Sequence, residues 1–220
     1  MANIQKAFGL RPISKLGSGT NSTGNSNYTS YAIANGNTNK IYQGQMVIPL
    51  ASGYIDRAQA AIGGNVSSVG VFWGCEYVSS VTGKPTFSNF WPGSGADSAH
   101  EIKAYVYDDP DQLFVVATDS TLTNEAGARG KVYKNAKFGI VANFTGYDGS
   151  DISGSSKAQL SVSTTATTNT FPMRIMGWMQ DSSNLDYTAL GVGMVVRLNN
   201  HFNAPNGSAN MGTAITTTGI

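Results

Sequence analysis

Residues 70–93, GVFWGCEYVSSVTGKPTFSNFWPG, decide the fold, because they read as two strands that fold back about Thr82, Gly83 and Lys84. In and just before the first of these strands, every second side chain is bulky or apolar: Val69, Val71, Trp73, Cys75 and Tyr77. A repeat of two residues is typical of a β-strand that buries one face. We therefore expect a hairpin whose first strand packs one side against a core.

The opposite face of this first strand carries little charge. It presents one acid among otherwise small or apolar residues, namely Gly70, Phe72, Gly74, Glu76 and Val78. A face of this kind is predicted to be covered by another sheet or by a neighbouring subunit. The segment holds two of the three tryptophans and no catalytic neighbours, which favours packing over chemistry.

The composition narrows the class of protein. The 220 residues fit one all-β domain or a domain with an arm, and charged residues make up only 12%. That is about half of the roughly 25% usual in globular domains. The formal net charge is +1 and no basic stripe is present, so neither nucleic acid nor an anionic membrane is an expected partner. No apolar run approaches the ~20 residues that cross a bilayer, and no secretory signal is expected.

The single cysteine, Cys75, permits no internal disulfide. It alternates with large apolar residues, so a small buried hydrophobe is predicted there in preference to a nucleophile. The chain is therefore expected to be made in a reducing cytoplasm.

Strand patterns recur along the rest of the chain. Further strands are predicted at 41–50, 86–91, 101–107, 112–118, 138–144, 158–163, 171–179 and 190–199. An acidic turn at 108–111 separates two of them, and short helix signals occur at 56–59 and 123–129. Short strands with Gly-rich turns predict an all-β fold, an antiparallel barrel or sandwich with an extended N-terminal arm.

Three regions are expected along the chain. Residues 1–40 would form an N-terminal docking peptide and extended arm, 41–202 the β body, and 203–220 a polar C-terminal tail. The stretch 14–39 is rich in Gly, Asn, Ser and Thr and buries little by itself. The alternative, which the residues leave open, is a first strand joined to the body by a long loop.

Few residues suggest chemistry. His100 and His201 are far apart and lack the spacing of zinc ligands, and the acidic turn 108–111 lacks the glycine and glutamate of a calcium loop. No nucleophile elbow or phosphate loop is present, so no catalytic residue, cofactor or metal site is predicted, and an enzyme is not expected. The tryptophans are better explained by packing in a core or a subunit interface than by sugar binding, and Trp91, which ends a strand before Pro92, is the best candidate for an exposed aromatic side chain.

Five segments carry a family resemblance: FGLRP at 8–12, GVFWGCEY at 70–77, TGKP at 82–85, NFWPG at 89–93 and AYVYDDP at 104–110. Together they resemble the head decoration (cement) proteins of tailed bacteriophages, of the marine and cyanobacterial podovirus-like kind. The resemblance covers the first dozen residues and much of 41–199. It does not cover 14–39 or the tail after 203.

The resemblance implies a non-enzymatic protein on the outer capsid surface of the virion. Its partners would be the major capsid protein and further copies of itself, with a trimer as the expected oligomer. The residues expected at partner interfaces are Phe8, Leu10, Arg11, Pro12, Phe72 and Trp91. Deleting residues 1–13 is then predicted to abolish capsid binding without unfolding the body.

A second hypothesis keeps the virion but changes the role. Aromatic content on an all-β frame also fits a tail or head-fibre component that binds host glycans, with Trp91 as its platform. Copy number would separate the two, because a cement protein should far outnumber a fibre in each particle.

Overall fold

The computed structural model describes residues 7–17, 28–58, 67–139, 149–168, 170–182 and 184–204. Within these ranges the regular secondary structure is almost wholly β, with one short helix, α1 (Glu125–Arg129). The strands are β1 (Arg11–Lys15), β2 (Thr29–Ile33), β3 (Ile41–Tyr42), β4 (Met46–Pro49), β5 (Ile55–Arg57), β6 (Gly70–Val78), β7 (Pro85–Ser88), β8 (Phe90–Trp91), β9 (Ile102–Tyr107), β10 (Gln112–Ala117), β11 (Asn135–Ala136), β12 (Met173–Trp178) and β13 (Gly193–Leu198). The predicted all-β class is confirmed.

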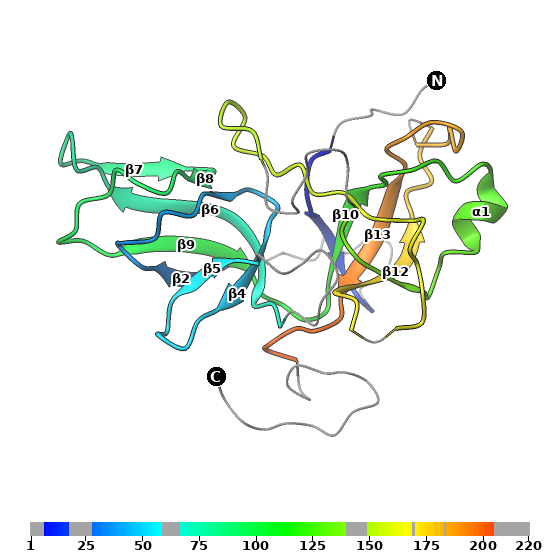
Figure 1. Ribbon diagram of the computed structural model, residues 1–220, viewed down its shortest axis with the longest axis horizontal. Coiled ribbons are helices and arrows are strands. Elements are labelled where there is room, and N and C mark those ends of the chain that lie inside the picture. The colour runs from blue at the N-terminus through cyan, green and yellow to red at the C-terminus, as the bar shows by residue number, and fades with distance from the viewer. Residues whose placement is uncertain are drawn as a thin grey trace.

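The strands form two main sheets that lie side by side (Figure 1). Sheet A has the order β1-β10-β13-β12-β11, and sheet B has the order β2-β9-β6-β4-β5 with β7 also paired to β6. Strands β3 and β8 make a separate two-stranded ladder. All ladders between these strands are antiparallel, and neither sheet closes on itself among the described strands. Of the two predicted forms, the sandwich is therefore the one observed.

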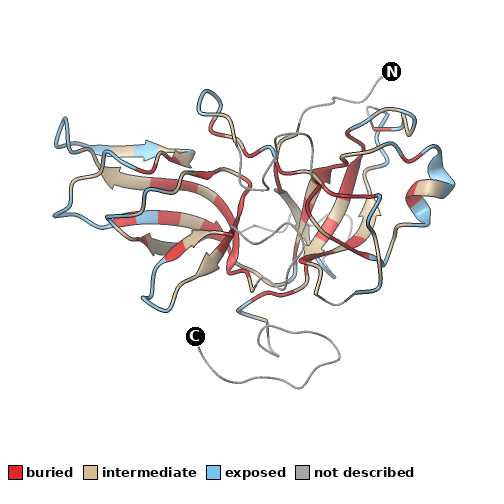
Figure 2. Cartoon of the chain, viewed as in Figure 1, coloured by how far each residue is buried: buried red, intermediate tan, exposed pale blue. Residues whose placement is uncertain are grey.

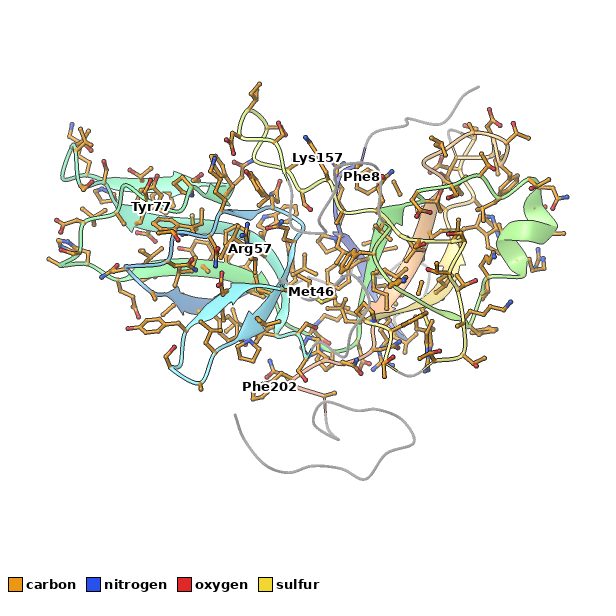
Figure 3. The ribbon with its side chains drawn as sticks, viewed as in Figure 1. Phe8, Met46, Arg57, Tyr77, Lys157 and Phe202 are labelled. Atoms are coloured by element: carbon orange, nitrogen blue, oxygen red, sulfur yellow. The ribbon has the colours of Figure 1, made fainter. Side chains whose placement is uncertain are left out.

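Each sheet packs on its own hydrophobic core. Core 1 lies on sheet A and includes Leu10 and Phe114, and core 2 lies on sheet B and includes Phe72 and Trp91. Met46 belongs to β4 of sheet B, yet it packs in core 1 between the two sheets (Figure 3). Buried positions gather along β10 and β13 and at the ends of the sheet B strands that meet them (Figure 2). The two sheets are thus packed into one body.

Strand β6 does not keep a single face buried along its length. Its pairing with β9 shifts register between Phe72 and Gly74, where Trp73 forms a bulge. As a result Phe72 and Cys75 lie in core 2, whereas Trp73 packs against core 1. The single alternating face predicted for 69–77 is therefore wrong, because one extra residue reverses the side that each later side chain takes.

The first described segment belongs to the body and not to a separate arm. Strand β1 pairs with β10, and Leu10 just before it is fully buried in core 1. Strand β2 pairs with β9 and buries Ile33 in core 2. The described parts of 1–40 therefore follow the alternative that the sequence left open, a first strand within the fold. Residues 1–6 and 18–27 lie outside the described residues.

The predicted strand 41–50 is interrupted at a close backbone crossing. It forms β3 and β4 with Gly44 between them in the left-handed region at φ +84°. A Cβ at Gly44 would lie 3.1 Å from both the amide nitrogen and the carbonyl oxygen of Leu10. The amide of Leu10 donates a 2.9 Å hydrogen bond to the carbonyl oxygen of Gly44. Glycine is therefore needed where the chain passes β1.

The acidic turn at 108–111 is confirmed, and it carries the chain from sheet B to sheet A. Its acids form ion pairs with sheet A, since Lys15 lies 2.6 Å from Asp109 and Arg197 lies 2.8 Å from Asp111. Pairs this exposed contribute about 0–1 kcal/mol each.

The remaining predicted elements have mixed outcomes. The helix at 123–129 is confirmed as α1, but 56–59 is wrong where it is described, because Asp56 and Arg57 lie in β5. Segment 158–163 forms no strand, although its predicted alternation buries Ala158, Leu160 and Val162. Most of 138–144 and the tail beyond 204 lie outside the described residues.

Candidate interaction surface

The face of sheet B that points away from core 2 carries exposed side chains on β9 and β7, and no other described strand packs over β9, β6 and β7 there. Residues directly opposite each other in an antiparallel ladder share a face. The register of the two ladders places Lys103, Glu76 and Phe87 in one row. None of the three belongs to either core, and Phe87 is 72% exposed. We call this side the outer face of sheet B.

Four aromatic side chains extend the outer face toward sheet A. The ring of Tyr28 lies 5.2 Å from that of Tyr105 and 6.3 Å from that of Tyr107, which in turn lies 5.2 Å from Trp73. The interplanar angles of 66°, 81° and 69° are edge-to-face, the geometry that ring quadrupoles favour. Tyr28 is 54% exposed and Tyr107 is buried, so the row runs from solvent into the body.

A hydrogen bond fixes the centre of this row. The hydroxyl of Tyr105 donates to Oε2 of Glu76 across 2.9 Å. This hydrogen bond is the main cause that raises the pKa of Tyr105 above its ordinary value, and partial desolvation adds to it. The phenol is therefore neutral at physiological pH, and the carboxylate holds the ring in place on the face.

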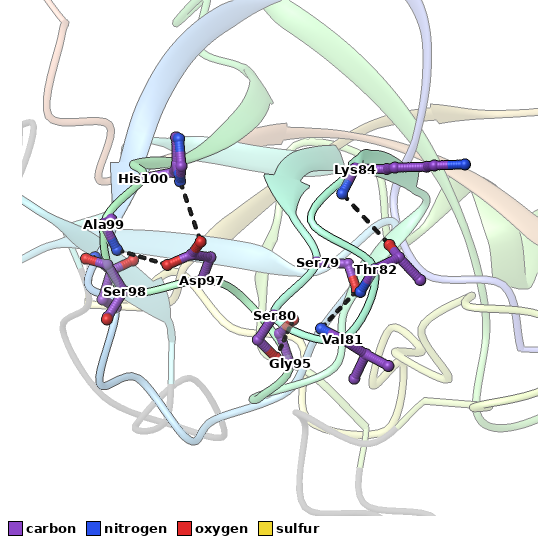
Figure 4. A network of polar contacts seen from close by, with 11 residues as sticks. Ser79, Ser80, Val81, Thr82, Lys84, Gly95, Asp97, Ser98, Ala99 and His100 are labelled. Carbon is purple, nitrogen blue, oxygen red and sulfur yellow. Dashed lines mark hydrogen bonds and ion pairs between the residues drawn. The ribbon is translucent and has the colours of Figure 1, made fainter.

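The β6–β7 turn carries the outer face to the end of the molecule, and a polar network holds it (Figure 4). The hydroxyl of Ser79 accepts the backbone amides of Val81 and Thr82 at 3.3 and 3.4 Å. The amide and hydroxyl of Ser80 both donate to the carbonyl oxygen of Gly95, at 2.9 and 3.1 Å. The turn is thus tied to the next loop, while the side chain of Val81 is 89% exposed.

The histidines and the cysteine of the described part of the chain lie apart from one another. No group of His, Cys, Asp and Glu there could hold a metal ion. His100 is a surface residue 3.5 Å from Asp97, and His201 is buried, accepting the amide of Asn203 on Nδ1, with burial lowering its pKa to about 4. Burial raises the pKa of the Cys75 thiol to about 12, which confirms the prediction of a small buried hydrophobe.

Three of the six residues predicted at partner interfaces are instead core residues. Leu10, Phe72 and Trp91 are each 0% exposed. They are large and apolar, and the fold buries them within the chain: Leu10 in core 1 and the other two in core 2. The indole N–H of Trp91 donates to the carbonyl oxygen of Asn37 at 3.2 Å. Trp91 is therefore not the exposed sugar platform that the second hypothesis required.

The other three predicted residues lie at the surface along β1. Phe8 and Pro12 are half-buried and Arg11 is exposed. The Arg11 guanidinium carbon lies 4.6 Å from the centroid of the Phe8 ring, a cation–π contact within the chain. Because β1 belongs to sheet A, the structure does not bring these residues together with the outer face of sheet B.

Sequence reasoning missed the aromatic row. Its signal lies in 101–107, where Lys103, Tyr105 and Tyr107 alternate with the buried Ile102, Ala104 and Val106. Tyr28 and Phe87 lack such a local signal. They reach the same face only because β2, which follows Tyr28, pairs with β9, and because β7 pairs with β6.

No family model matches the chain, and neither a curated protein nor a solved structure matches it. The described residues contain no helix long and apolar enough to cross a membrane. The function is therefore inferred from the surface described above.

Proposed function

We propose that this chain is a non-enzymatic capsid decoration (cement) protein that binds the outer surface of a phage head and stabilises it by bridging capsid subunits. The observation that supports this best is the outer face of sheet B together with the adjoining β6–β7 turn, where Tyr28, Phe87 and the turn residue Val81 expose apolar and aromatic surface. Large apolar side chains gathered on one face mark protein interaction sites, and aromatic residues are enriched in interfaces.

The form of the body suits such a role. A protein that bridges shell subunits needs no acid, base or cofactor, but it needs a rigid surface that keeps its shape under load. The bulge at Trp73 lets β6 contribute to both cores, and the outer face is built on that strand. Exposed aromatic side chains on a well-packed sheet lose little conformational freedom when they bind.

The partners are the major capsid protein and other copies of this chain. A trimer fits a local three-fold axis of a capsid, and closed cyclic symmetry is the usual form of soluble oligomers. A stable pairwise contact would bury roughly 1,200–2,000 Å² in total. Because many copies bind one particle, modest single contacts are strengthened by multivalency. The site of action is the outer capsid surface, after synthesis in the host cytoplasm.

The docking role expected for residues 1–13 is not part of this proposal. Leu10 lies in core 1 and β1 completes sheet A, so the described part of this segment from Leu10 onward is already used within the chain. Capsid binding is assigned instead to the outer face of sheet B.

The test is quantitative mass spectrometry of purified virions of the phage that encodes the chain. The proposal expects a copy number comparable with that of the shell protein, and release of the chain from the outside of intact particles by mild denaturant. Absence from virions, or a few copies per particle, would refute it. A low copy number would favour the glycan-binding fibre, which has lost its expected platform because Trp91 is buried.

A further inference from the structure

A cavity lies between α1 and the loop that follows β10, well away from the outer face of sheet B. Its volume is about 310 Å³, and it is lined by residues 120–123, by Gly127 and Lys131 of the α1 region, and by residues 162–163. Ligand pockets span ~300–1,000 Å³, so this one has room for a single small ring.

The walls of the cavity are held by the backbone. The amides of Leu122 and Thr123 both donate to the carbonyl oxygen of Tyr187, at 2.9 and 3.1 Å. Thr123 is held in the left-handed region at φ +71°, which β-branched residues rarely adopt. A Cβ at Gly127 would collide with the carbonyl oxygen of Leu122, so glycine lets α1 close against the loop. The cavity is therefore preformed.

Three of the polar side chains that line the cavity have unused hydrogen-bonding capacity. The Lys131 ammonium and the hydroxyls of Thr121 and Thr123 make no hydrogen bond or ion pair with any described residue. An ammonium offers three donors and a hydroxyl offers one donor together with acceptor lone pairs. The lining contains one cation and no carboxylate.

Asp119, on the same loop, lies beside the cavity but is not one of its lining residues. The carboxylate of Asp119 accepts the hydroxyl of Ser120 at 3.0 Å and the amide of Val162 at 3.2 Å. A Cβ at Gly139 would lie 2.5 Å from Oδ2 of Asp119, so the carboxylate packs against that glycine. Its charge is thus partly satisfied by hydrogen bonds from Ser120 and Val162 in the cavity wall.

We propose that this cavity binds a small hydroxylated oxyanion, a sugar ring that carries a carboxylate or a phosphate. The acidic group pairs with the Lys131 ammonium, and the ring hydroxyls bond to Thr121 and Thr123. The buried side chains of Leu122 and Val162 form the floor that contacts the apolar side of the ring. This site is independent of the capsid-binding face.

The experiment titrates the purified full-length chain by NMR with glucuronate, glucose 6-phosphate and neutral glucose. Saturable shifts in residues 120–131 are expected with either acidic sugar, with neutral glucose at least tenfold weaker, and the tighter acid identifies the anionic group. Lys131→Gln should weaken acid binding about tenfold, as loss of one charge-assisted contact predicts. Lys134→Gln, at an exposed lysine outside the lining, is the matched control and should change nothing.

Thr121→Val separates the hydroxyl contact from the charge. It should weaken both acidic sugars while leaving the folded spectrum unchanged, because Thr121 is exposed and has no partner among the described residues. Failure of both acidic sugars to give saturable shifts, or equal binding by Lys131→Gln and the parent chain, would overturn the proposal.

Discussion

Leu10→Ala tests whether the N-terminal segment is part of the body or a detachable docking peptide. Leu10 is 0% exposed, it packs in core 1, and its amide is bonded to Gly44 across 2.9 Å. Truncating a fully buried leucine to alanine costs about 2–5 kcal/mol, from lost apolar burial and the cavity left behind. A docking peptide would show almost no loss, because its side chain would be free in the isolated chain.

The expected size of the effect makes it measurable. A cost of about 3 kcal/mol corresponds to a fall in Tm of roughly 6–12 °C for a chain of this length. Domains are stable by only ~5–15 kcal/mol, so a loss of this size is a large share of the total and leaves a folded but clearly weakened variant. Deleting residues 1–13 removes Leu10 and also the pairing of Arg11 and Pro12 with β10, and should unfold sheet A.

The assay is urea and thermal unfolding of the purified chain, followed by circular dichroism and tryptophan fluorescence. Leu16→Ala is the matched control, because Leu16 lies just beyond the other end of β1 and is 43% exposed. It should cost no more than about 1 kcal/mol. Equal shifts for Leu10→Ala and Leu16→Ala, or a deletion variant as stable as the parent, would refute this account of β1.

Three further predictions follow from single positions. Gly70→Ala should lower the free energy of unfolding by about 3 kcal/mol or more, because Gly70 has φ +155° and a Cβ there would strike the backbone of β9. The control Gly83→Ala, at φ +66° in open space, should cost only about 1–2 kcal/mol. Similar costs for the two variants would contradict this explanation. Burial lowers the pKa of His201 to about 4 in the folded chain, against 6.5 for an ordinary histidine. As the pH falls, the unfolded chain therefore binds a proton before the folded chain does. The free energy of unfolding should fall by up to about 3 kcal/mol between about pH 6.5 and pH 4. The urea midpoint should lose this pH dependence in His201→Gln and keep it in His100→Gln. An unchanged pH dependence in His201→Gln would show that His201 is not its cause. Phe87→Ser should weaken binding to capsids stripped of this protein, measured in a pelleting assay, without changing Tm, because Phe87 is exposed. The control Phe87→Leu should retain most of the binding. Undiminished binding by Phe87→Ser would show that the outer face of sheet B is not the capsid-binding site.

Local chemistry explains which parts of the fold the sequence predicts well. The hairpin of β6 and β7 and the turn at 108–111 follow from alternation, glycine and proline within a few residues. The bulge at Trp73 does not, because a register shift depends on the partner strand β9. The fold class therefore comes from the sequence, while the side that each β6 residue takes comes from the pairing.

The candidate surface shows the same limit more strongly. Leu10 and Trp91 look like exposed anchors in the sequence, because apolar residues next to glycine or proline suit both cores and interfaces. Their burial is decided by contacts with distant elements, such as Gly44 for Leu10 and Asn37 for Trp91. Tyr28 and Phe87 reach the same face only through β2 and β7, which lie at two edges of sheet B. Whether a side chain is exposed depends on the assembled sheet, so the pattern of a single strand does not predict it.

The two proposed sites lie at opposite ends of the molecule, and this arrangement bears on how they would work together. The β6–β7 hairpin is at one end of the long axis and α1 is at the other (Figure 1). If the outer face of sheet B holds the chain on a capsid, the cavity beside α1 is not blocked by that contact. No shared residue links the two sites, so Lys131→Gln should leave capsid binding unchanged and Phe87→Ser should leave binding of acidic sugars unchanged. An attached protein would then present one cavity per copy, and weak binding of an acidic sugar at each would be strengthened by the number of copies on the particle.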